Sequence, residues 1–361
     1  MSQSVGDGRN GSGPALISWN VTSHCNLRCA HCYLDAGDSG RNPELTTSEA
    51  KMLIDQVTRV GSPVMILSGG EPLLRGDLFE IAEYGTSRGL RMVLGTNGTL
   101  IDDRTAVRLG EAGIRKAAIS LDSADPGVHD RFRGVRGAWS RAVTGIEACR
   151  EAGIGLQIHT TVTLQNYQEL DAITALGENL GVHDFQFFFL VPTGRGKDVT
   201  DISPERYETL IRGILQLRAD RGLAIRPTCA PQYVRIASEM GLPVAKGERG
   251  CIAGIRYCRI DPTGEVTPCP YLPLSLGNIR TTSFAEIWNG SEVFTNLRSG
   301  EALTGKCGRC EYRSTCGGCR ARAYGLTEVV SHACGGAVQR SGGDYLAQDP
   351  WCLYEPGKKV R

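Results

Sequence analysis

Cysteine stands out in this chain of 361 residues, which contains 14 of them. Three lie close together at Cys25, Cys29 and Cys32, and nine more fall between Cys251 and Cys352. Thiols that gather in dense groups are typical of metal or iron–sulfur sites, whereas the thiols of a reducing compartment rarely form disulfides. The distribution therefore predicts a metalloprotein and not a scaffold held by disulfides.

The N-terminal cysteines form a C-x3-C-x2-C run in one short segment. Three thiolates can hold three irons of a [4Fe–4S] cube and leave the fourth iron open to another ligand. Structural zinc sites normally use four protein ligands, so three close cysteines favour the open cluster. His24 or His31 could instead complete a zinc site of three cysteines and one histidine.

Short apolar runs alternate with segments of helical period, and this alternation must position the cysteines. It predicts βαβ units and a parallel sheet, as in an incomplete (β/α) barrel or a doubly wound fold. Polar groups at the carboxyl ends of such strands face the ligand, and the cysteine run, Gly69–Pro72 and Ser120–Asp122 all lie there. The predicted strands are residues 15–21, 63–67, 91–94, 116–121, 155–162 and 185–190, and the helices are 47–59, 78–88, 102–112, 138–152, 166–180 and 204–218.

Charge and composition exclude several classes of protein. The 40 Lys and Arg balance the 39 Asp and Glu, so no overall field attracts nucleic acid or an anionic membrane. No run of 18 apolar residues is present, and residues 1–14 read as a polar, flexible tail without the apolar core of a signal peptide. We expect a cytoplasmic protein with a barrel domain at residues 15–245 and a cysteine-rich domain at 246–361.

The order of motifs after the first strand resembles the radical S-adenosylmethionine (SAM) superfamily over about residues 15–195. That resemblance implies that Cys25, Cys29 and Cys32 hold a [4Fe–4S] cluster whose open iron binds SAM. The reduced cluster would then cleave SAM to a 5′-deoxyadenosyl radical that takes a hydrogen atom from the substrate.

The same resemblance implies a set of SAM contacts. Gly69, Gly70 and Glu71 match the segment near the methionine amino group, where glycines allow a close backbone approach. Ser120 and Asp122 match a strand end that contacts the ribose or carboxylate. Arg133 matches an arginine near the carboxylate, for which a guanidinium fork is suited, and His31 takes the position beside the adenine.

The C-terminal cysteines resemble the SPASM domain, which carries auxiliary [4Fe–4S] clusters. Eight thiolates are enough for two clusters, although C-x2-C pairs also bind zinc. The resemblance implies a first auxiliary set, Cys307, Cys310, Cys316 and Cys352, and a second set, Cys251, Cys258, Cys269 and Cys319. Two residues separate Cys316 from Cys319 where the SPASM pattern has three, so the sequence departs from the family at the second set.

The remaining cysteines have simpler interpretations. Cys149 lies on a predicted helix and is expected to be a buried core residue. Cys229 lies between two prolines and either lines a substrate cavity or is structural. His332 and Cys334 fall in a glycine-rich insertion at residues 328–343 and are expected to be loop residues.

Segments at residues 190–197, 227–233, 316–324 and 343–347 resemble the heme-synthesis branch of the superfamily. This resemblance implies oxidative decarboxylation of two propionates of Fe-coproporphyrin III to vinyls, giving heme b, with a flavodoxin or ferredoxin as electron donor. Such a flat, carboxylate-rimmed tetrapyrrole needs apolar walls and cations. We expect Arg195, Lys197 and Arg226 to supply the cations, unless they are solvated loop charges.

Three other functions fit parts of the pattern. Related enzymes act in heme d1 synthesis or on didecarboxysiroheme, and other SPASM proteins modify ribosomal peptides. Residues 1–14 are too short and polar for a peptide-binding module, which disfavours the peptide function. An iron–sulfur electron carrier or zinc scaffold would have no need of the Gly69–Pro72 and Ser120–Asp122 motifs.

Overall fold

The structure, a computed structural model, describes residues 13–37, 43–199, 202–327, 329–332, 338–341 and 343–357. The tail predicted at residues 1–14 therefore lies outside the described residues except for Gly13 and Pro14, and Cys334 also lies outside them. Within the described ranges no helix is long and apolar enough to cross a membrane.

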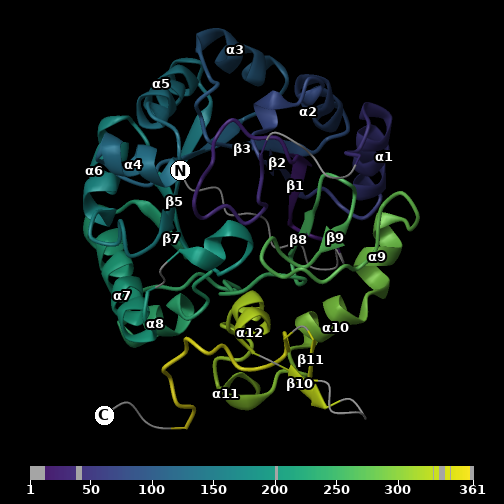
Figure 1. The fold of residues 1–361 in the computed structure, drawn as a ribbon, viewed down its shortest axis with the longest axis vertical. Coiled ribbons are helices and arrows are strands. Elements are labelled where there is room, and N and C mark those ends of the chain that lie inside the picture. The colour runs from purple at the N-terminus through teal and green to yellow at the C-terminus, as the bar shows by residue number, and fades with distance from the viewer. Residues whose placement is uncertain are drawn as a thin grey trace.

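A curved parallel sheet forms the centre of the fold, with helices around its outside (Figure 1). Its first six strands lie side by side in sequence order, each parallel to the next. This arrangement confirms the predicted α/β fold, a partial (β/α)6 TIM-like barrel. The strands are β1 (Leu16–Thr22), β2 (Val64–Gly69), β3 (Arg91–Thr96), β4 (Lys116–Ser120), β5 (Gly155–Val162) and β6 (Asp184–Phe189). The helices between and after them are α1 (Thr47–Thr58), α2 (Leu78–Ser87), α3 (Asp103–Glu111), α4 (Pro126–Arg133), α5 (Ala138–Glu151), α6 (Leu170–Asn179) and α7 (Pro204–Arg221).

Alternation along β1 separates the two faces of the sheet. Ile17, Trp19 and Val21 are fully buried in the core that the sheet shares with the outer helices. Successive residues of a strand point to opposite faces, so Ser18 and Asn20 face the barrel interior. Cys149 of α5 belongs to the same outer core and is 0% exposed, which confirms it as a buried core residue.

Two helices differ from the sequence-based limits. α6 begins at Leu170 and not at residue 166, because Asn166 is held in the preceding turn. The Asn166 side chain accepts from the N–H of Thr163 at 2.9 Å and donates to the carbonyl of Asp122 at 2.8 Å. α4 was not predicted, although Asp125 caps it and a proline occupies its first turn.

Three further strands extend the sheet beyond the six that were predicted. β7 (Ala224–Thr228) pairs with β6, and its proline suits an edge position. β8 (Tyr257–Ile260) pairs in parallel with β1, and β9 (Val266–Thr267) pairs with β8. The nine-stranded sheet therefore continues across residue 245, and the division into domains at that point stays a prediction.

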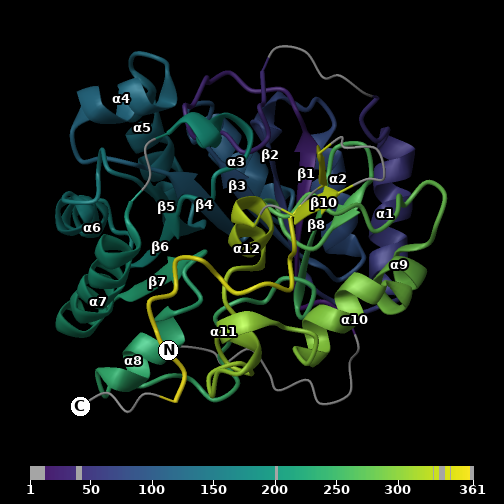
Figure 2. The same ribbon diagram turned by 60° about the horizontal axis from the view of Figure 1, so that its bottom comes forward.

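The C-terminal region lies across one side of the barrel in both views, with α11 between α8 and α10 (Figures 1 and 2). Its described residues form two strands within the insertion at 328–343, so the prediction of a loop is wrong there. β10 (Val329–His332), which contains His332, pairs antiparallel with β11 (Val338–Ser341). The helices of this half are α8 (Tyr233–Glu239), α9 (Phe284–Gly290), α10 (Glu292–Ser299), α11 (Gly305–Gly308) and α12 (Arg320–Leu326).

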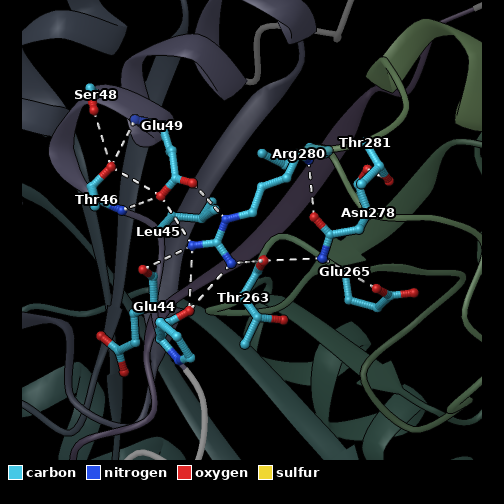
Figure 3. A network of polar contacts seen from close by, with 12 residues as sticks. Glu44, Leu45, Thr46, Ser48, Glu49, Thr263, Glu265, Asn278, Arg280 and Thr281 are labelled. Atoms are coloured by element: carbon cyan, nitrogen blue, oxygen red, sulfur yellow. Dashed lines mark hydrogen bonds and ion pairs between the residues drawn. The ribbon is translucent and has the colours of Figure 1, made fainter.

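Arg280 fastens this C-terminal region to the first helix of the barrel (Figure 3). Its guanidinium donates to the two carboxylate oxygens of Glu49 at 2.6 and 3.0 Å. It also donates to the carbonyls of Glu44 and Thr263, each at 3.1 Å. The Glu44 carboxylate accepts from the N–H of Ser23 at 2.7 Å. The network thus joins the C-terminal region, α1 and the start of the cysteine-bearing loop.

Candidate active site

The N-terminal cysteines lie on the loop that follows β1, which we call the cluster loop (residues 23–37). Each of their sulfurs accepts a hydrogen bond. The sulfur of Cys25 accepts from the N–H two residues later at 3.4 Å, and that of Cys32 from the N–H four residues later at 3.5 Å. The sulfur of Cys29 accepts from the guanidinium of Arg133 at 3.7 Å.

This donor set fits an iron–sulfur cluster with three cysteine ligands. Hydrogen bonds to the sulfurs are one means by which proteins tune such clusters. Among the described residues, no group of three or more His, Cys, Asp and Glu side chains is arranged to hold a single metal ion. Burial raises the pKa of Cys25 to about 11, and burial also raises the pKa of Cys29 in spite of the nearby Arg133. A cluster that binds here must therefore displace protons from the thiols.

Asp122 and Arg133 form a buried ion pair directly behind the cluster loop. Asp122, just after β4, accepts from Arg133 Nε at 2.6 Å and from the N–H of Thr161 at 2.8 Å. Burial acts to raise the pKa of Asp122, but the charge of Arg133, the nearby histidines and the hydrogen bond from Thr161 together outweigh it, and the pKa is lowered. Two N–H groups of the cluster loop also donate to backbone carbonyls at the end of α4. Arg133 is thus committed to Asp122 and Cys29, and a contact with SAM stays a prediction.

The two glycines at the end of β2, Gly69 and Gly70, are required by the position of the cluster loop. Gly69 has φ +134°, and a Cβ placed there would lie 2.3 Å from the carbonyl oxygen of Thr22. A Cβ on Gly70 would lie 2.1 Å from the carbonyl oxygen of His24. Any larger side chain would push the cluster loop away from β2, so these glycines position the loop whether or not they also contact SAM.

Glu71 holds the ends of β2 and β3 together. It is 0% exposed, and its carboxylate accepts from the hydroxyl of Thr96 at 2.8 Å and from the N–H groups of Asn97 and Leu73 at 2.9 and 3.2 Å. Asn97 then donates to the side chain of Asn26, on the cluster loop, at 2.8 Å. Sequence reasoning missed Asn26 and Asn97 as site residues, although both lie in motifs beside predicted ones.

His31 and Ser120 are the two remaining members of the predicted set of SAM contacts, and their contacts with SAM stay predictions. The His31 ring stacks on Phe132 of α4 with 4.2 Å between centroids, and its buried Nδ1 has no hydrogen-bond partner. An unpartnered polar atom at this position fits a ligand that supplies the missing bond. Ser120 ends β4, half-buried and in register with His159 of β5.

Arg195 contacts the cluster loop instead of an open cavity. Its guanidinium donates to the carbonyl oxygens of Cys29 and Ala36, each at 3.1 Å, and to the carboxylate of Asp35 at 2.7 Å. A Cβ on the preceding Gly194, whose φ is +55°, would lie 2.5 Å from the carbonyl oxygen of Cys32. Gly194 and Arg195 therefore pack closely against the cluster loop.

The other two cations proposed for the substrate have different surroundings from Arg195, and a contact of any of the three with the substrate stays a prediction. Lys197 is exposed on the short 3-10 turn Gly194–Asp198. Arg226 is exposed on β7 and donates to the hydroxyl of Tyr233 at 3.1 Å and to the carbonyl of Arg249 at 3.4 Å.

The first auxiliary set is brought together by the structure. All four members line a single cavity: Cys307, Cys310, Cys316 and Cys352. The sulfur of Cys307 accepts from the N–H of Asp349 and from the guanidinium of Arg320, each at 3.4 Å. Four thiols around one hollow, with donors aimed at a sulfur, fit a [4Fe–4S] cluster with four cysteine ligands.

The second auxiliary set is not brought together as predicted, because Cys258 lies apart. Cys258 is in register with Ile17 of β1 and, like it, is fully buried in the outer core. A strand residue with that parity points toward the helices and away from the barrel interior. Arg298 is the one charged group that acts on its thiol. The structure thus corrects the predicted set by separating Cys258 from the other three cysteines.

Cys229 lies where the fourth member of this set was expected. It packs with Cys269 and Cys319 in one small apolar cluster. Burial raises its pKa, and Cys319, Cys269 and Cys251 all lie near enough to raise it further. Its φ of +57° is unusual for a residue other than glycine. Its carbonyl oxygen accepts from Arg322 at 3.0 Å, which helps to hold the strained backbone in place.

Asp349 connects the two auxiliary sets. Its backbone N–H donates to the sulfur of Cys307, and its carboxylate accepts from the N–H of Cys319 at 2.8 Å. The same carboxylate pairs with Arg322 at 3.2 Å, and both side chains are 0% exposed. The sequence contains no motif that would have identified Asp349, because its partners come from distant segments.

Known proteins resemble this chain over both regions. The model of the radical SAM superfamily matches residues 19–176, and that of the SPASM iron–sulfur cluster-binding domain matches residues 251–319. An AdoMet-dependent heme synthase of Methanosarcina barkeri is 43% identical over 96% of this chain and 98% of its own length. The chain belongs to the radical SAM superfamily. A second AdoMet-dependent heme synthase, from Oleidesulfovibrio alaskensis, is 43% identical to this radical SAM chain over 95% of it and 88% of the relative.

A solved structure shares the fold. Streptococcus suis SuiB bound to the precursor peptide SuiA superposes with a TM-score of 0.70, at 18% identity, over 86% of this chain and 72% of SuiB. As a radical SAM enzyme the chain uses SAM (AdoMet) with a [4Fe–4S] cluster, and its SPASM domain binds auxiliary iron–sulfur clusters.

Proposed function

We propose that this radical SAM enzyme converts two propionates of Fe-coproporphyrin III to vinyls and so forms heme b. The observation that carries the proposal is the 43% identity to an AdoMet-dependent heme synthase over nearly the full length of both chains. That likeness includes the cysteine-rich half as well as the barrel, so it concerns the whole catalytic assembly.

The reaction needs a hydrogen-atom acceptor on one side of the substrate and an electron acceptor near it. Loss of a hydrogen atom from the propionate β-carbon leaves a radical; departure of CO2 and one electron then gives the vinyl group. When bound, the cluster on the cluster loop and SAM supply the radical that takes the hydrogen. The second auxiliary set lies near the cluster loop. Tyr33 of the cluster loop contacts Tyr271, which is two residues after Cys269, at 5.3 Å between ring centroids.

For the second auxiliary cluster we propose the ligands Cys229, Cys251, Cys269 and Cys319. Apolar packing brings Cys229, Cys269 and Cys319 together, and Cys251 lies within electrostatic range of all three. The first auxiliary cluster is proposed to use the four cysteines of the shared cavity.

We further propose that the enzyme works in the cytoplasm and receives electrons from a flavodoxin or ferredoxin. Each cysteine in the described part of the chain is a free thiol, a state that a reducing compartment maintains. Near-zero net charge favours neither nucleic acid nor an anionic membrane as a partner.

The direct test is anaerobic incubation of the cluster-loaded enzyme with Fe-coproporphyrin III, SAM and dithionite. We expect the mass of the porphyrin to fall by the loss of two propionate carboxyl groups, with formation of 5′-deoxyadenosine. The Cys29→Ala variant should form neither product. A wild-type enzyme that cleaves SAM but leaves this porphyrin unchanged would point to another tetrapyrrole or to a peptide.

A further inference from the structure

One guanidinium inside the barrel lacks the partners that the other interior cations have. Arg259 lies on β8 in register with Ser18 of β1. Its neighbours Cys258 and Ile260 are fully buried in the outer core, so alternation turns Arg259 toward the barrel interior. The Nε atom of Arg259 is buried and has no hydrogen-bond partner. Across the described ranges of the chain, no carboxylate forms an ion pair with it.

The surroundings of Arg259 lie between the cluster loop and the second auxiliary set. Asn20 lies two residues beyond Ser18 on the same face of β1, and its side chain donates at 3.1 Å to the hydroxyl of Tyr33, which follows the last cluster-loop cysteine. Arg259, opposite Ser18 on the neighbouring strand, is therefore close to the cluster loop. The Tyr33 ring also contacts that of Tyr271, which lies two residues after Cys269 of the second auxiliary set. Tyr257 lies within electrostatic range of both rings. A substrate bound between the cluster loop and the second auxiliary set would lie beside Arg259 and these tyrosines.

Three other cations of the barrel are already engaged, whereas Arg249, in the segment before β8, shares with Arg259 a buried Nε that has no partner. Arg133 pairs with Asp122, Lys116 pairs with Asp184, and Arg195 donates to the cluster loop. A buried donor without an acceptor is costly, because it has lost its bonds to water and gained none from the protein. An anion that enters the barrel would accept the missing hydrogen bond from Arg259 and so remove this cost. A carboxylate suits it best, because its two oxygens match the guanidinium fork.

We propose that Arg259 binds a propionate carboxylate of the substrate. This inference rests on the proposed function, since it takes a carboxylate-rimmed porphyrin as the ligand. It replaces the cations expected from the sequence with one whose place in the interior depends on the pairing of β8 with β1.

The test measures binding of Fe-coproporphyrin III to the cluster-loaded enzyme with SAM and without reductant, so that no turnover occurs. We expect Arg259→Gln to raise the Kd by about 10- to 100-fold, the loss of a charge-assisted hydrogen-bonded pair. Arg259→Lys keeps the charge and should lose less. Arg88→Gln is the matched control, because Arg88 is exposed, directly follows the outer helix α2 and pairs with Asp55 at 2.8 Å; its Kd should equal that of the wild type.

Iron content, thermal midpoint and SAM affinity are measured for each variant, and we expect all three to match the wild type. An unchanged porphyrin Kd in Arg259→Gln overturns the inference. A weakened SAM affinity with normal porphyrin binding also overturns it, because Arg259 would then bind the SAM carboxylate. If the wild type does not bind Fe-coproporphyrin III at all, the proposed function falls and this inference falls with it.

Discussion

Replacing Cys229 and Cys258 one at a time separates the ligand set proposed from the structure from the set implied by the SPASM resemblance. Three clusters of about four irons each amount to about twelve irons per chain. Cys229→Ala removes one of four thiolates from the second auxiliary set, so the iron content should fall to about eight. Cys258→Ala removes a sulfur from the outer core, far from the other cysteines of that set. It should keep about twelve irons and lose about 1 kcal/mol of stability, the cost of one buried methylene-sized group.

The assay is iron and acid-labile sulfide per chain after anaerobic reconstitution, together with the electron paramagnetic resonance spectrum of the reduced protein. SAM cleavage to 5′-deoxyadenosine should persist in both variants, because the cluster loop retains its three cysteines. The thermal midpoint serves as the control for folding. A loss of about four irons from Cys258→Ala, with none from Cys229→Ala, would refute the reasoning from strand parity. Equal loss from both, with lowered thermal midpoints, would show that the sites are structural and not ligating.

Two further predictions concern the residues that position the cluster loop. Burial raises the pKa of Glu71 from 4.5 to about 7, so its contribution to stability is complete below pH 4.5 and is lost as pH rises through about 7. Glu71→Gln should remove this pH dependence and lower the free energy of unfolding by about 1–3 kcal/mol, because the glutamine N–H2 group meets hydrogen-bond donors instead of acceptors. Anaerobic thermal unfolding at several pH values measures the pH dependence and the loss of stability. An unaltered pH profile would contradict the raised pKa of Glu71. Arg280→Ala should cost about 1–3 kcal/mol, since its guanidinium joins α1 to the C-terminal region with several charge-assisted bonds. Lys51→Ala breaks the more exposed pair with Glu80 and should cost less stability than Arg280→Ala; equal losses in the two variants would show that the Arg280 network has no special role.

The regular part of the barrel could be predicted because its signals are local. Apolar runs and helical periods placed the first six strands and most of the outer helices within a few residues. β7 and β8 were missed because each is short, and β7 contains a proline. Nothing near residue 257 in the sequence indicates that this segment adds to β1, since strand pairing depends on residues far away in the chain.

The candidate site also contains residues that the sequence indicated and contacts that only the folded structure shows. The glycines at 69 and 70 were singled out from a motif, but the atoms that require them, the carbonyls of Thr22 and His24, are visible only in the folded chain. Arg195 was expected at the substrate, yet its guanidinium is held by carbonyls of the cluster loop. A charged residue near a strand end has several partners within reach, and only packing chooses among them.

The sequence by itself indicated a metalloprotein, because most ligands of the cluster loop and of the first auxiliary set are close in the chain, and the order of its motifs pointed to iron–sulfur clusters through the family resemblance. The tertiary structure decided which distant residues share a site. Cys258 and Arg259 are adjacent in sequence, but the register of β8 against β1 turns Cys258 into the outer core and Arg259 into the barrel interior. A strand alternates its side chains with a period of two, so a shift of one residue in pairing would exchange their roles. That register is set by contacts between strands about 240 residues apart, which no local pattern contains.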